Sequence, residues 1–362
     1  MRHVCCTVVP PHIFDYMAEH AESPAHRELA ARAIAHIRER HANREEESTR
    51  TRLRLATGVL GAAGGVAVAA PAIVHRKVYT ARNTVRLPGD LVETDGLPAS
   101  SDVTVTEADA GAKRTAEFYQ AVFGRSSVDG HGLALLSTVH YSRQYDNAFW
   151  NGGQMVYGDG DATLFDRFTK CLDVIGHELT HGVTQYTANL AYHNQSGALN
   201  ESISDVFGSM VKQNALNQTA DQADWLIGAG LFIPKAGVNR AALRSMKAPG
   251  TAYDDPTAIG KDPQPAHMSQ YRTLPDTAAG DYGGVHINSG IPNKAFYEAA
   301  KGFGGRSWER AGQVWYTALT NGALAGTASF VDFRNATRAV AQTLFGAGGA
   351  QIVQNAWASV GL

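Results

Sequence analysis

The string His-Glu-Leu-Thr-His at residues 177–181 constrains this 362-residue chain more than any other feature. Two histidines four residues apart project from one face of an α-helix, so His177 and His181 can bind the same metal ion. Glu178 lies one position further round the helix and can reach the open coordination site as a base. The string therefore predicts a metal-binding helix whose geometry suits hydrolysis better than metal storage.

A third ligand is expected from Glu201, which follows His181 by 20 residues. That distance lets the first helix end and a second helix present the carboxylate. Zinc at hydrolytic sites takes three protein ligands and keeps a fourth position for water, and two histidines with one glutamate form one known set. Asn200 or Asp205 could accept a hydrogen bond from the histidine nitrogen that does not bind metal, which would fix the tautomer. The string alone can occur by chance in a long helix, but these neighbours favour zinc.

Several separated motifs resemble, in order and spacing, the thermolysin family of secreted metallopeptidases over almost all of residues 78–362. The motifs are HYS at 140–142, NAFWNG at 147–152, MVYGDGD at 155–161, YHNQSGA at 192–198, ALRSM at 242–246 and GGVHINSG at 283–290. The resemblance implies an α+β, two-lobed fold. A β-rich amino-terminal lobe and an α-helical carboxy-terminal lobe would flank the zinc helix.

The expected chemistry is hydrolysis of a peptide bond by a water that zinc activates. Glu178 would take a proton from this water and pass it to the leaving nitrogen. The resemblance implies that His286 and Tyr192 stabilise the oxyanion, with Asp281 holding the His286 ring charged and oriented. Either ring alone is more often a packed core residue, but the glycines before His286 permit the tight loop geometry of a cleft.

The resemblance also implies a site for an extended peptide. Asn147 and the carbonyl of Ala148 match the family's clamp for the substrate backbone, and Arg244 would hold the carbonyl of the residue after the scissile bond. The apolar specificity pocket would be lined by Phe165, Phe168, Val174 and Leu243. These residues predict cleavage before bulky hydrophobic side chains, although Phe168 could equally belong to the core.

The expected calcium ligands depart from the family pattern. Asp173 and Asp224 are present, but Lys212 and Ala229 stand where glutamates are expected. An ammonium group in a calcium cage replaces the charge of the ion and removes a ligand. We therefore expect zinc as the metal, no double calcium site, and a contact of Lys212 with Asp173 or Asp224.

Residues 1–76 are expected to form a short propeptide or accessory segment with a linker. Apolar residues at helical spacing predict two short amphipathic helices between Phe14 and about Asn43, interrupted near Ser23-Pro24. The stretch at residues 10–13 (PPHI) resembles the short propeptide of the protealysin group. This resemblance implies that the segment lies in the cleft of the precursor and inhibits it from within the same molecule.

Cys5 or Cys6 could in addition bind the zinc as a thiolate, and two incidental buried thiols are the alternative. The three cysteines, which include Cys171, cannot form a disulfide framework. The amino terminus lacks the apolar core of a standard signal peptide, and the uncharged run Leu55–Val74 is broken by Pro71. We therefore expect no stable membrane insertion, and we expect a secreted monomer, with a cytoplasmic precursor as the alternative location.

The remaining chain divides into the two lobes. Residues 77–188 are expected to form the β-rich lobe with the zinc helix at its end, and residues 189–362 the helical lobe. Helices are predicted at 108–123, 166–188, 202–214, 292–303, 306–321, 329–345 and 349–358. A net charge of −2 and the lack of a basic patch in the catalytic part argue against nucleic acid as a partner.

Three functions are compatible with these motifs. The first is a zinc endopeptidase made as an autoinhibited precursor, with peptides and proteins as substrates. The second is a catalytically inactive module that holds zinc and binds peptides, and the oxyanion residues together with Glu178 argue against it. The third is a zinc amidase for a non-protein amide, which the clamp at Asn147 and Ala148 and the arginine at 244 disfavour.

Overall fold

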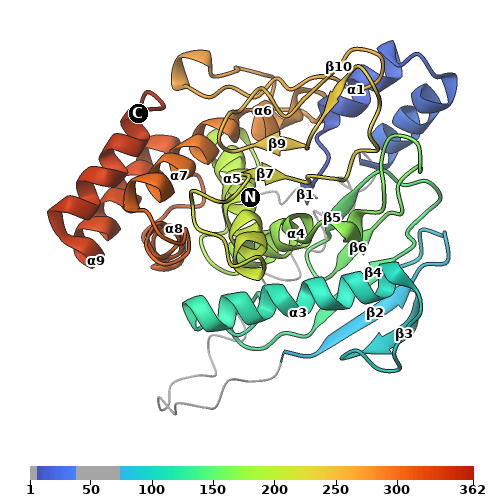
Figure 1. The fold of residues 1–362 in the computed structure, drawn as a ribbon, viewed down its shortest axis with the longest axis horizontal. Helices are drawn as coiled ribbons and strands as arrows, with labels where there is room; N and C mark the ends of the chain where they lie inside the picture. Colours follow the sequence, from blue (N-terminus) through green and yellow to red (C-terminus); the bar gives the residue numbers. More distant parts are fainter. Residues whose placement is uncertain (1–5, 38–73) are drawn as a thin grey trace.

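Two central helices separate a six-stranded sheet from a group of carboxy-terminal helices (Figure 1). The computed structural model describes residues 6–37 and 74–362. The central helices are α4 (Leu172–Gln185) and α5 (Asn194–Ala215), which pack against each other along their lengths. The mixed architecture, with strands in the amino-terminal part and helices in the carboxy-terminal part, is the predicted α+β fold.

The main sheet has the strand order β1-β5-β6-β4-β2-β3. Its strands are β1 (Cys6–Thr7), β2 (Arg76–Thr80), β3 (Asp90–Thr94), β4 (Leu135–Val139), β5 (Ala148–Trp150) and β6 (Met155–Tyr157). β4 is parallel to both of its neighbours, and the other pairs are antiparallel. Every residue of β5 and β6 is buried, so these strands carry apolar side chains on both faces. The edge strand β1 comes from the amino-terminal segment.

Helix α3 (Val103–Phe123) packs against the strands and against α4. The Asp102 side chain accepts a hydrogen bond from the Thr104 amide and caps its first turn. Gly124 ends the helix in a left-handed conformation with φ 66°. Both ends of α3 therefore follow ordinary capping chemistry.

The central helices approach closely at two glycines. A Cβ atom on Gly208 of α5 would lie 2.4 Å from the Asp173 carbonyl oxygen and 2.9 Å from the His177 amide nitrogen. A Cβ atom on Gly176 of α4 would lie 3.0 Å from the Gly208 Cα. Only glycine fits at residue 208, and the close contact brings the second helix next to the His-Glu-Leu-Thr-His string.

The helical lobe contains α6 (Asp281–Asn288), α7 (Gly290–Phe303), α8 (Ala311–Thr320) and α9 (Phe330–Ala358). Ser329 and Asp332 form a capping box at the start of α9, and the helix is kinked at Gly346, where φ is 67°. Trp315 of α8 and Trp357 of α9 stack with ring centroids 6.2 Å apart. Short strands lie between α5 and α6 in the sequence and form two small sheets: β7 (Leu226–Ile227), β8 (Asn239–Arg240), β9 (Arg244–Ser245), β10 (Tyr253–Asp255) and β11 (Gly260–Lys261).

The amino-terminal segment packs against residues of both lobes, and its helices lie at one edge of the molecule (Figure 1). After β1 it forms α1 (Pro11–His20) and a second helix over residues 24–37. Tyr16 donates a hydrogen bond to the Pro256 carbonyl, and the absence of a side chain at Gly260 leaves room for its ring. His36 lies 2.7 Å from the Tyr141 hydroxyl. Each of the two helices of the segment is thus hydrogen-bonded to the rest of the molecule.

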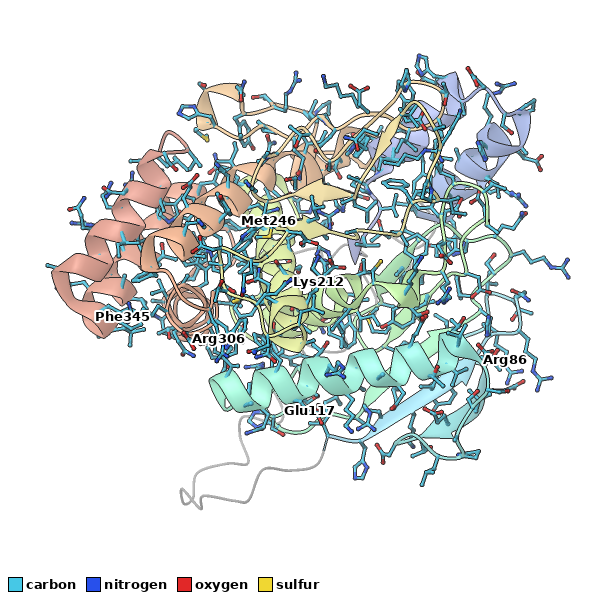
Figure 2. All side chains as sticks on the ribbon, viewed as in Figure 1. Arg86, Glu117, Lys212, Met246, Arg306 and Phe345 are labelled. Atoms are coloured by element: carbon cyan, nitrogen blue, oxygen red, sulfur yellow. The ribbon has the colours of Figure 1, made fainter. Side chains whose placement is uncertain are left out.

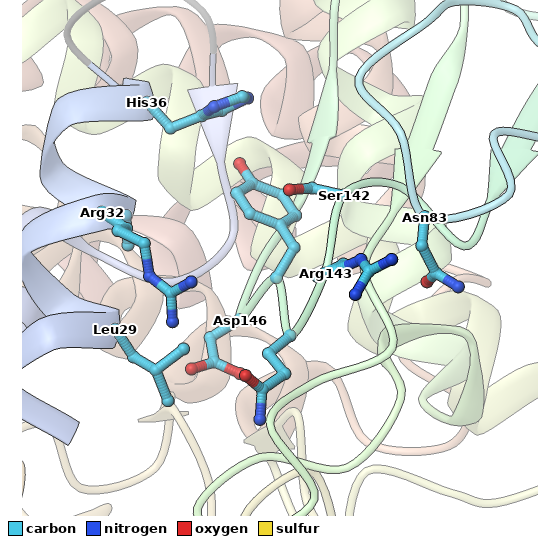
Figure 3. Close-up of a pocket in the computed structure, with 10 residues that line it drawn as sticks. Leu29, Arg32, His36, Asn83, Ser142, Arg143 and Asp146 are labelled. Atoms are coloured by element: carbon cyan, nitrogen blue, oxygen red, sulfur yellow. The ribbon is translucent and has the colours of Figure 1, made fainter. Parts of the chain in front are cut away.

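A cavity of about 360 Å³ lies between the 24–37 helix and the loop before β5 (Figure 3). Arg32 points from the helix toward Asp146 of the loop. Burial and the nearby Asp161 raise the pKa of Asp146 well above its usual value, whereas Arg32 opposes this shift. Arg32 of the segment therefore faces an acidic group of the β-rich lobe.

The element bounds differ from the sequence predictions in places. The zinc helix begins at Leu172 rather than 166, because residues 168–170 form a separate 3-10 turn. α5 begins at Asn194, before the predicted start at residue 202, and the two predicted final helices are joined into α9 across the Gly346 kink. No helix in the described part of the chain is long and apolar enough to cross a membrane. The run Leu55–Val74 falls, except for its last residue, outside that part.

Candidate active site

The predicted zinc ligands converge at the contact between α4 and α5. The ligand atoms of His177, His181 and Glu201 all lie within 4.8 Å of one another, and all three residues are buried. The two Nε2 atoms are 3.1 Å apart, and each lies 3.5 Å from an oxygen of Glu201. Glu201 Oε2 has no hydrogen-bond partner among the described residues although it is buried. Two imidazole nitrogens and one carboxylate that face a common point are a donor set that fits zinc.

The other nitrogen of each histidine is held by a residue of α5. His177 Nδ1 lies 2.8 Å from Asp205 Oδ1, and His181 Nδ1 lies 2.9 Å from Asn200 Oδ1. Ser204 Oγ is also 3.0 Å from His181 Nδ1. Because Nδ1 donates to an oxygen, the Nε2 lone pair of each ring is left to bind a metal. The structure thus places both Asn200 and Asp205, which the sequence offered as alternatives, beside the Nδ1 atoms of the two histidines.

Asp205 joins the metal ligands to the rest of the cleft. Arg244 donates to both carboxylate oxygens at 2.8 Å, and Asn293 Nδ2 donates to Oδ2 at 2.8 Å. Burial opposes the charge on Asp205, but Arg244 and His177 outweigh it and hold the pKa of the carboxyl well below its usual range. The position of Arg244 is therefore tied to that of a predicted metal ligand.

Glu178 is oriented by the sheet. Its Oε2 accepts a hydrogen bond from the Trp150 backbone amide at 2.8 Å, and the side chain is fully buried. Trp150 is the last residue of β5, and its indole donates to Gln185 near the end of α4. A carboxylate fixed in this way beside the two histidines can exchange a proton with a water held between them.

His286 and Tyr192 both lie next to the Glu201 carboxylate. His286 Nδ1 lies 2.6 Å from Asp281 Oδ1, and Nε2 lies 3.1 Å from the Tyr192 hydroxyl, which donates to Glu201. Nε2 also lies 3.0 Å from the carbonyl oxygen of Thr7. Because a carboxylate and a carbonyl only accept hydrogen bonds, both ring nitrogens donate and the ring is positively charged.

The electrostatic environment of His286 agrees with this charge. Burial opposes it, but attraction to Asp281 and Glu201 outweighs burial and raises the pKa of His286 to about 9. The ring is placed by a left-handed stretch at the start of α6, where Gly283 has φ 85°. A Cβ atom on Gly283 would lie 2.2 Å from Asn194 Oδ1, so this position requires glycine.

The predicted peptide clamp is in contact with the chain's own amino-terminal segment. Val9 exchanges two hydrogen bonds with the Asn147 side chain, at 3.0 Å and 3.2 Å. The Val8 amide donates to the Ala148 carbonyl at 3.1 Å, and Arg244 donates to the Val8 carbonyl at 2.8 Å. Strand β1 continues this pairing antiparallel to β5. The sequence placed the segment in the cleft by resemblance but did not identify these contacts.

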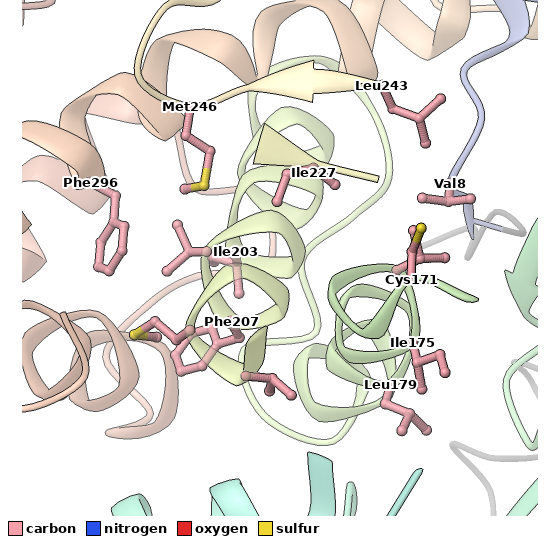
Figure 4. Packing of buried hydrophobic residues seen from close by; sticks show 14 of the residues in the cluster. Val8, Cys171, Ile175, Leu179, Ile203, Phe207, Ile227, Leu243, Met246 and Phe296 are labelled. Atoms are coloured by element: carbon pink, nitrogen blue, oxygen red, sulfur yellow. The ribbon is translucent and has the colours of Figure 1, made fainter. Parts of the chain in front are cut away.

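The predicted specificity residues are all buried in one hydrophobic cluster that also contains Val8. These residues are Phe165, Phe168, Val174 and Leu243. In the view of Figure 4, Val8 lies between Leu243 and Cys171. The Phe168 ring contacts Phe165 at a centroid distance of 5.8 Å.

Lys212, labelled in Figure 2, lies on α5 and contacts the acidic residues that the sequence predicted as its partners. Its Nζ is 2.8 Å from Asp173 and 3.0 Å from Asp224, and it donates to the Leu226 carbonyl at 2.7 Å. Burial opposes the ammonium charge, but Asp173 and Asp224 outweigh it and raise the pKa of Lys212. Ala229 has a methyl side chain and supplies no carboxylate. Its backbone carbonyl accepts a hydrogen bond from the Cys171 thiol.

Some contacts were not predicted from the sequence. Asn293, Ser204 and the Trp150 amide hold site residues, yet none stands at a spacing that marks it. The proposed zinc thiolate stays a prediction, because Cys5 and the Cys6 side chain lie outside the described residues.

Comparison with known proteins places these observations in context. Residues 74–185 match the family model described as thermolysin metallopeptidase, catalytic domain, and residues 188–362 match its alpha-helical domain. An extracellular metalloprotease of Pectobacterium carotovorum subsp. carotovorum is 51% identical over 288 residues, which cover 80% of this chain and 81% of that protein. Protease PrtS of Photorhabdus sp. (strain Az29) is 48% identical over 289 residues, covering 80% of this chain and 76% of that protein.

A solved structure is similar over nearly the whole chain. The precursor of protealysin, a metalloproteinase from Serratia proteamaculans, superimposes with a TM-score of 0.84 and 45% sequence identity. The match covers 98% of this chain and 99% of that one. It therefore includes the amino-terminal segment as well as both lobes.

Proposed function

This chain belongs to the thermolysin family of metallopeptidases, and from that premise we propose that it is a zinc endopeptidase whose amino-terminal segment blocks its own cleft. The observation that carries the proposal is the meeting of His177, His181 and Glu201 beside the buried Glu178 carboxylate. The precursor state of the similar protealysin structure supports the second half of the proposal.

Each residue of the site has its own role in the proposed hydrolysis. Zinc, when bound, supplies a Lewis acid that lowers the pKa of a water and polarises a carbonyl. Glu178, oriented by the Trp150 amide, takes the water's proton and hands it to the leaving nitrogen. His286 Nε2 donates to the carbonyl oxygen as negative charge develops there, with the Tyr192 hydroxyl beside it. Asp281 holds the His286 ring in the donating orientation.

The cleft supports a preference for a bulky hydrophobic side chain after the scissile bond. Arg244 and Ala148 hold the backbone of Val8, and the Val8 side chain belongs to the same cluster as the predicted pocket residues. Phe165 and Phe168 belong to the same cluster, with ring centroids 5.8 Å apart. Apolar neighbours of this kind favour burial of a hydrophobic side chain.

Inhibition by the amino-terminal segment is supported by competition for the same groups. Residues 7–9 contact Asn147, Ala148, Arg244 and His286, which are the groups proposed to bind a substrate. A substrate cannot form these hydrogen bonds until the segment leaves. Relatives that include an extracellular metalloprotease support action outside the cell.

The proposal is tested by incubating the zinc-loaded protein with casein after removal of residues 1–73, which leaves β2 and the part that matches the catalytic domain intact. We expect cleavage that a chelator abolishes, and a loss of about 10²- to 10⁴-fold on Glu178→Gln. The uncut precursor should be nearly inactive. Protein that lacks the segment, binds zinc and still leaves casein intact would reject the proposal; if it bound peptides, a catalytically inactive binding module would replace it.

A further inference from the structure

We infer that the peptide bond between Thr7 and Val8 is a cleavage site of the protein's own active site, cut within the same molecule. This inference rests on the proposed endopeptidase function and names a particular substrate bond. The segment would then be a bound substrate as well as an inhibitor that blocks the cleft.

The first step is the identity of the carbonyl that faces the catalytic groups. Three successive carbonyls of the segment have different partners: Thr7 contacts His286, Val8 contacts Arg244, and Val9 contacts Asn147. Among the described residues, His286 is the partner for which contacts with Tyr192, at 3.1 Å, and with Glu201, at 3.6 Å, are seen. The Thr7 carbonyl is therefore the one presented to the metal ligands and to the proposed oxyanion donors.

The second step is the position of the base relative to this carbonyl. In the antiparallel pairing of β1 with β5, Thr7 lies opposite Phe149 and Cys6 opposite Trp150. The Trp150 amide donates a hydrogen bond to Glu178. The base is therefore bound to the residue that follows Phe149, the strand partner of Thr7, while the proposed oxyanion donor His286 contacts the Thr7 carbonyl itself.

The third step concerns the hydrogen bonds to Val8 and Val9, which follow the scissile bond. The amide and carbonyl of Val8 and those of Val9 each form a hydrogen bond with Ala148, Arg244 or Asn147, at 2.8–3.2 Å. The Val8 side chain is buried in the hydrophobic cluster. A leaving group held in one orientation beside a fixed base is what hydrolysis requires.

The reaction is a hydrolysis and needs only water. The water oxygen bonds to the Thr7 carbonyl carbon, and the bond from that carbon to the Val8 nitrogen breaks. Glu178 takes one proton from the water and passes it to the Val8 nitrogen, and the second water proton leaves the new carboxyl group for solvent. Thr7 gains a carboxylate and Val8 a free amino group, with no change in oxidation state. Tyr16 and His36 still anchor the part that begins at Val8, so the cleft stays filled after the cut.

The decisive experiment follows the full-length zinc-loaded chain by intact mass and amino-terminal sequencing in water enriched in ¹⁸O. We expect a new terminus at Val8, a released fragment of residues 1–7 with one ¹⁸O in its Thr7 carboxylate, and a rate that tenfold dilution leaves unchanged. Glu178→Ala should abolish the cut. Val8→Asp should slow it at least tenfold because a carboxylate would enter the hydrophobic cluster, whereas Val8→Leu should retain it.

A second readout does not depend on catalysis. In the zinc-free full chain, the Val8 and Val9 amides should be protected from hydrogen exchange because Ala148 and Asn147 accept from them. Val8→Asp should lose this protection, and Val8→Leu should keep it. Exchange of both amides in the parent at the rate of an open chain would overturn the inference.

The two proposals fail in different ways. A protein that cleaves casein while the Thr7–Val8 bond stays intact in its precursor overturns the inference and leaves the endopeptidase function standing. A cut whose rate rises with protein concentration shows that another molecule makes it and overturns the intramolecular step. If neither casein nor this bond is cut, both proposals are rejected.

Discussion

Asp205 shows how much a single residue contributes to this site. One carboxylate accepts from His177, Arg244 and Asn293, which come from three separate parts of the chain. The residue that orients a metal ligand therefore also orients the arginine that contacts the backbone of the amino-terminal segment. Loss of metal and loss of peptide binding should accompany each other in any variant that moves this carboxylate.

A second charged residue, His140, lies away from the site and makes a pH prediction possible. Its ring bridges Asp159 at 2.9 Å and Asp102, the cap of α3, at 2.8 Å. The hydrogen bond with Asp159 is the largest cause that raises the pKa of His140, from 6.5 to about 9. The folded state therefore binds this proton more tightly than the unfolded state does.

We predict that His140→Gln lowers the free energy of unfolding by about 1–2 kcal/mol at pH 6, a value reduced from the full pKa shift because the carboxylates are partly exposed. The stabilisation is complete below pH 6.5 and is lost as the pH rises through about 9. Urea unfolding of parent and variant at pH 6 and pH 10 measures this difference. An equal difference at both values would contradict the prediction.

The local site residues were predictable to different degrees. His177, Glu178 and His181 lie within one helical turn and a half, so their spacing alone placed them together. Tyr192, His286 and Asp281 are distant in sequence, and only the family resemblance related them to the metal ligands. The contacts of residues 7–9 could not be predicted, because a strand of two residues has no periodic pattern.

At the scale of elements, the packing of α4 on α5 decides whether the three ligands meet. Gly176 and Gly208 remove the side chains that would separate the two helices. The backbone of α5 therefore lies directly on the turn of α4 that carries His177. A metal site built from two helices needs this approach as much as it needs the ligands themselves.

We predict that Gly208→Ala lowers the free energy of unfolding by at least about 2 kcal/mol, because overpacking in a core costs about 1–3 kcal/mol and the contact here is with backbone. Zinc affinity should fall with it, since the new methyl group displaces the His177 backbone. Thermal unfolding and zinc competition with a chelator measure both effects. The matched control is Gly348→Ala in α9, where a Cβ atom meets nothing within 4 Å. That change should leave both quantities unaltered or raise stability slightly.

The helix bounds show where sequence patterns stop being informative. Residues 194–201 of α5 include Asn, Ser and Gly, which are weak helix formers, so the pattern predicted a later start. Packing overrides this preference, because Ser196 to Glu201 are all buried. In α9, Gly346 was correctly treated as an interruption, but the chain resumes its helix directly after the kink.

At the scale of the whole molecule, Lys212 joins three parts of the chain that a metal ion could otherwise join. Its ammonium contacts Asp173 at the start of α4 and Asp224 with Leu226 beside β7, while the residue itself belongs to α5. The positive charge of Lys212 belongs to the chain itself, so it does not depend on the concentration of metal ions in the medium. The two-lobed arrangement itself came from the family resemblance, because no local pattern relates the lobes.

We predict that millimolar calcium leaves the melting temperature of the zinc-loaded protein unchanged. Lys212→Ala should lower the free energy of unfolding by about 2–3 kcal/mol, because it leaves the buried Asp173 carboxylate without its partner. Differential scanning calorimetry with calcium or with a calcium-selective chelator checks both statements. Lys301→Ala, at an exposed ion pair with Asp221, is the control and should cost less than about 1 kcal/mol. A rise of several degrees on adding calcium to the parent would contradict the prediction.

The position of β1 at the edge of the sheet has a consequence for biosynthesis. Chains emerge from the ribosome amino terminus first, and domains fold as their residues become available. Residues 6–9 are made before β5, and long before Arg244 and His286 complete the cleft. Residues 6–9 are therefore synthesised before the cleft that they occupy has formed. No copy of this chain needs to pass through a stage in which an assembled cleft is open to other proteins of the cell that makes it.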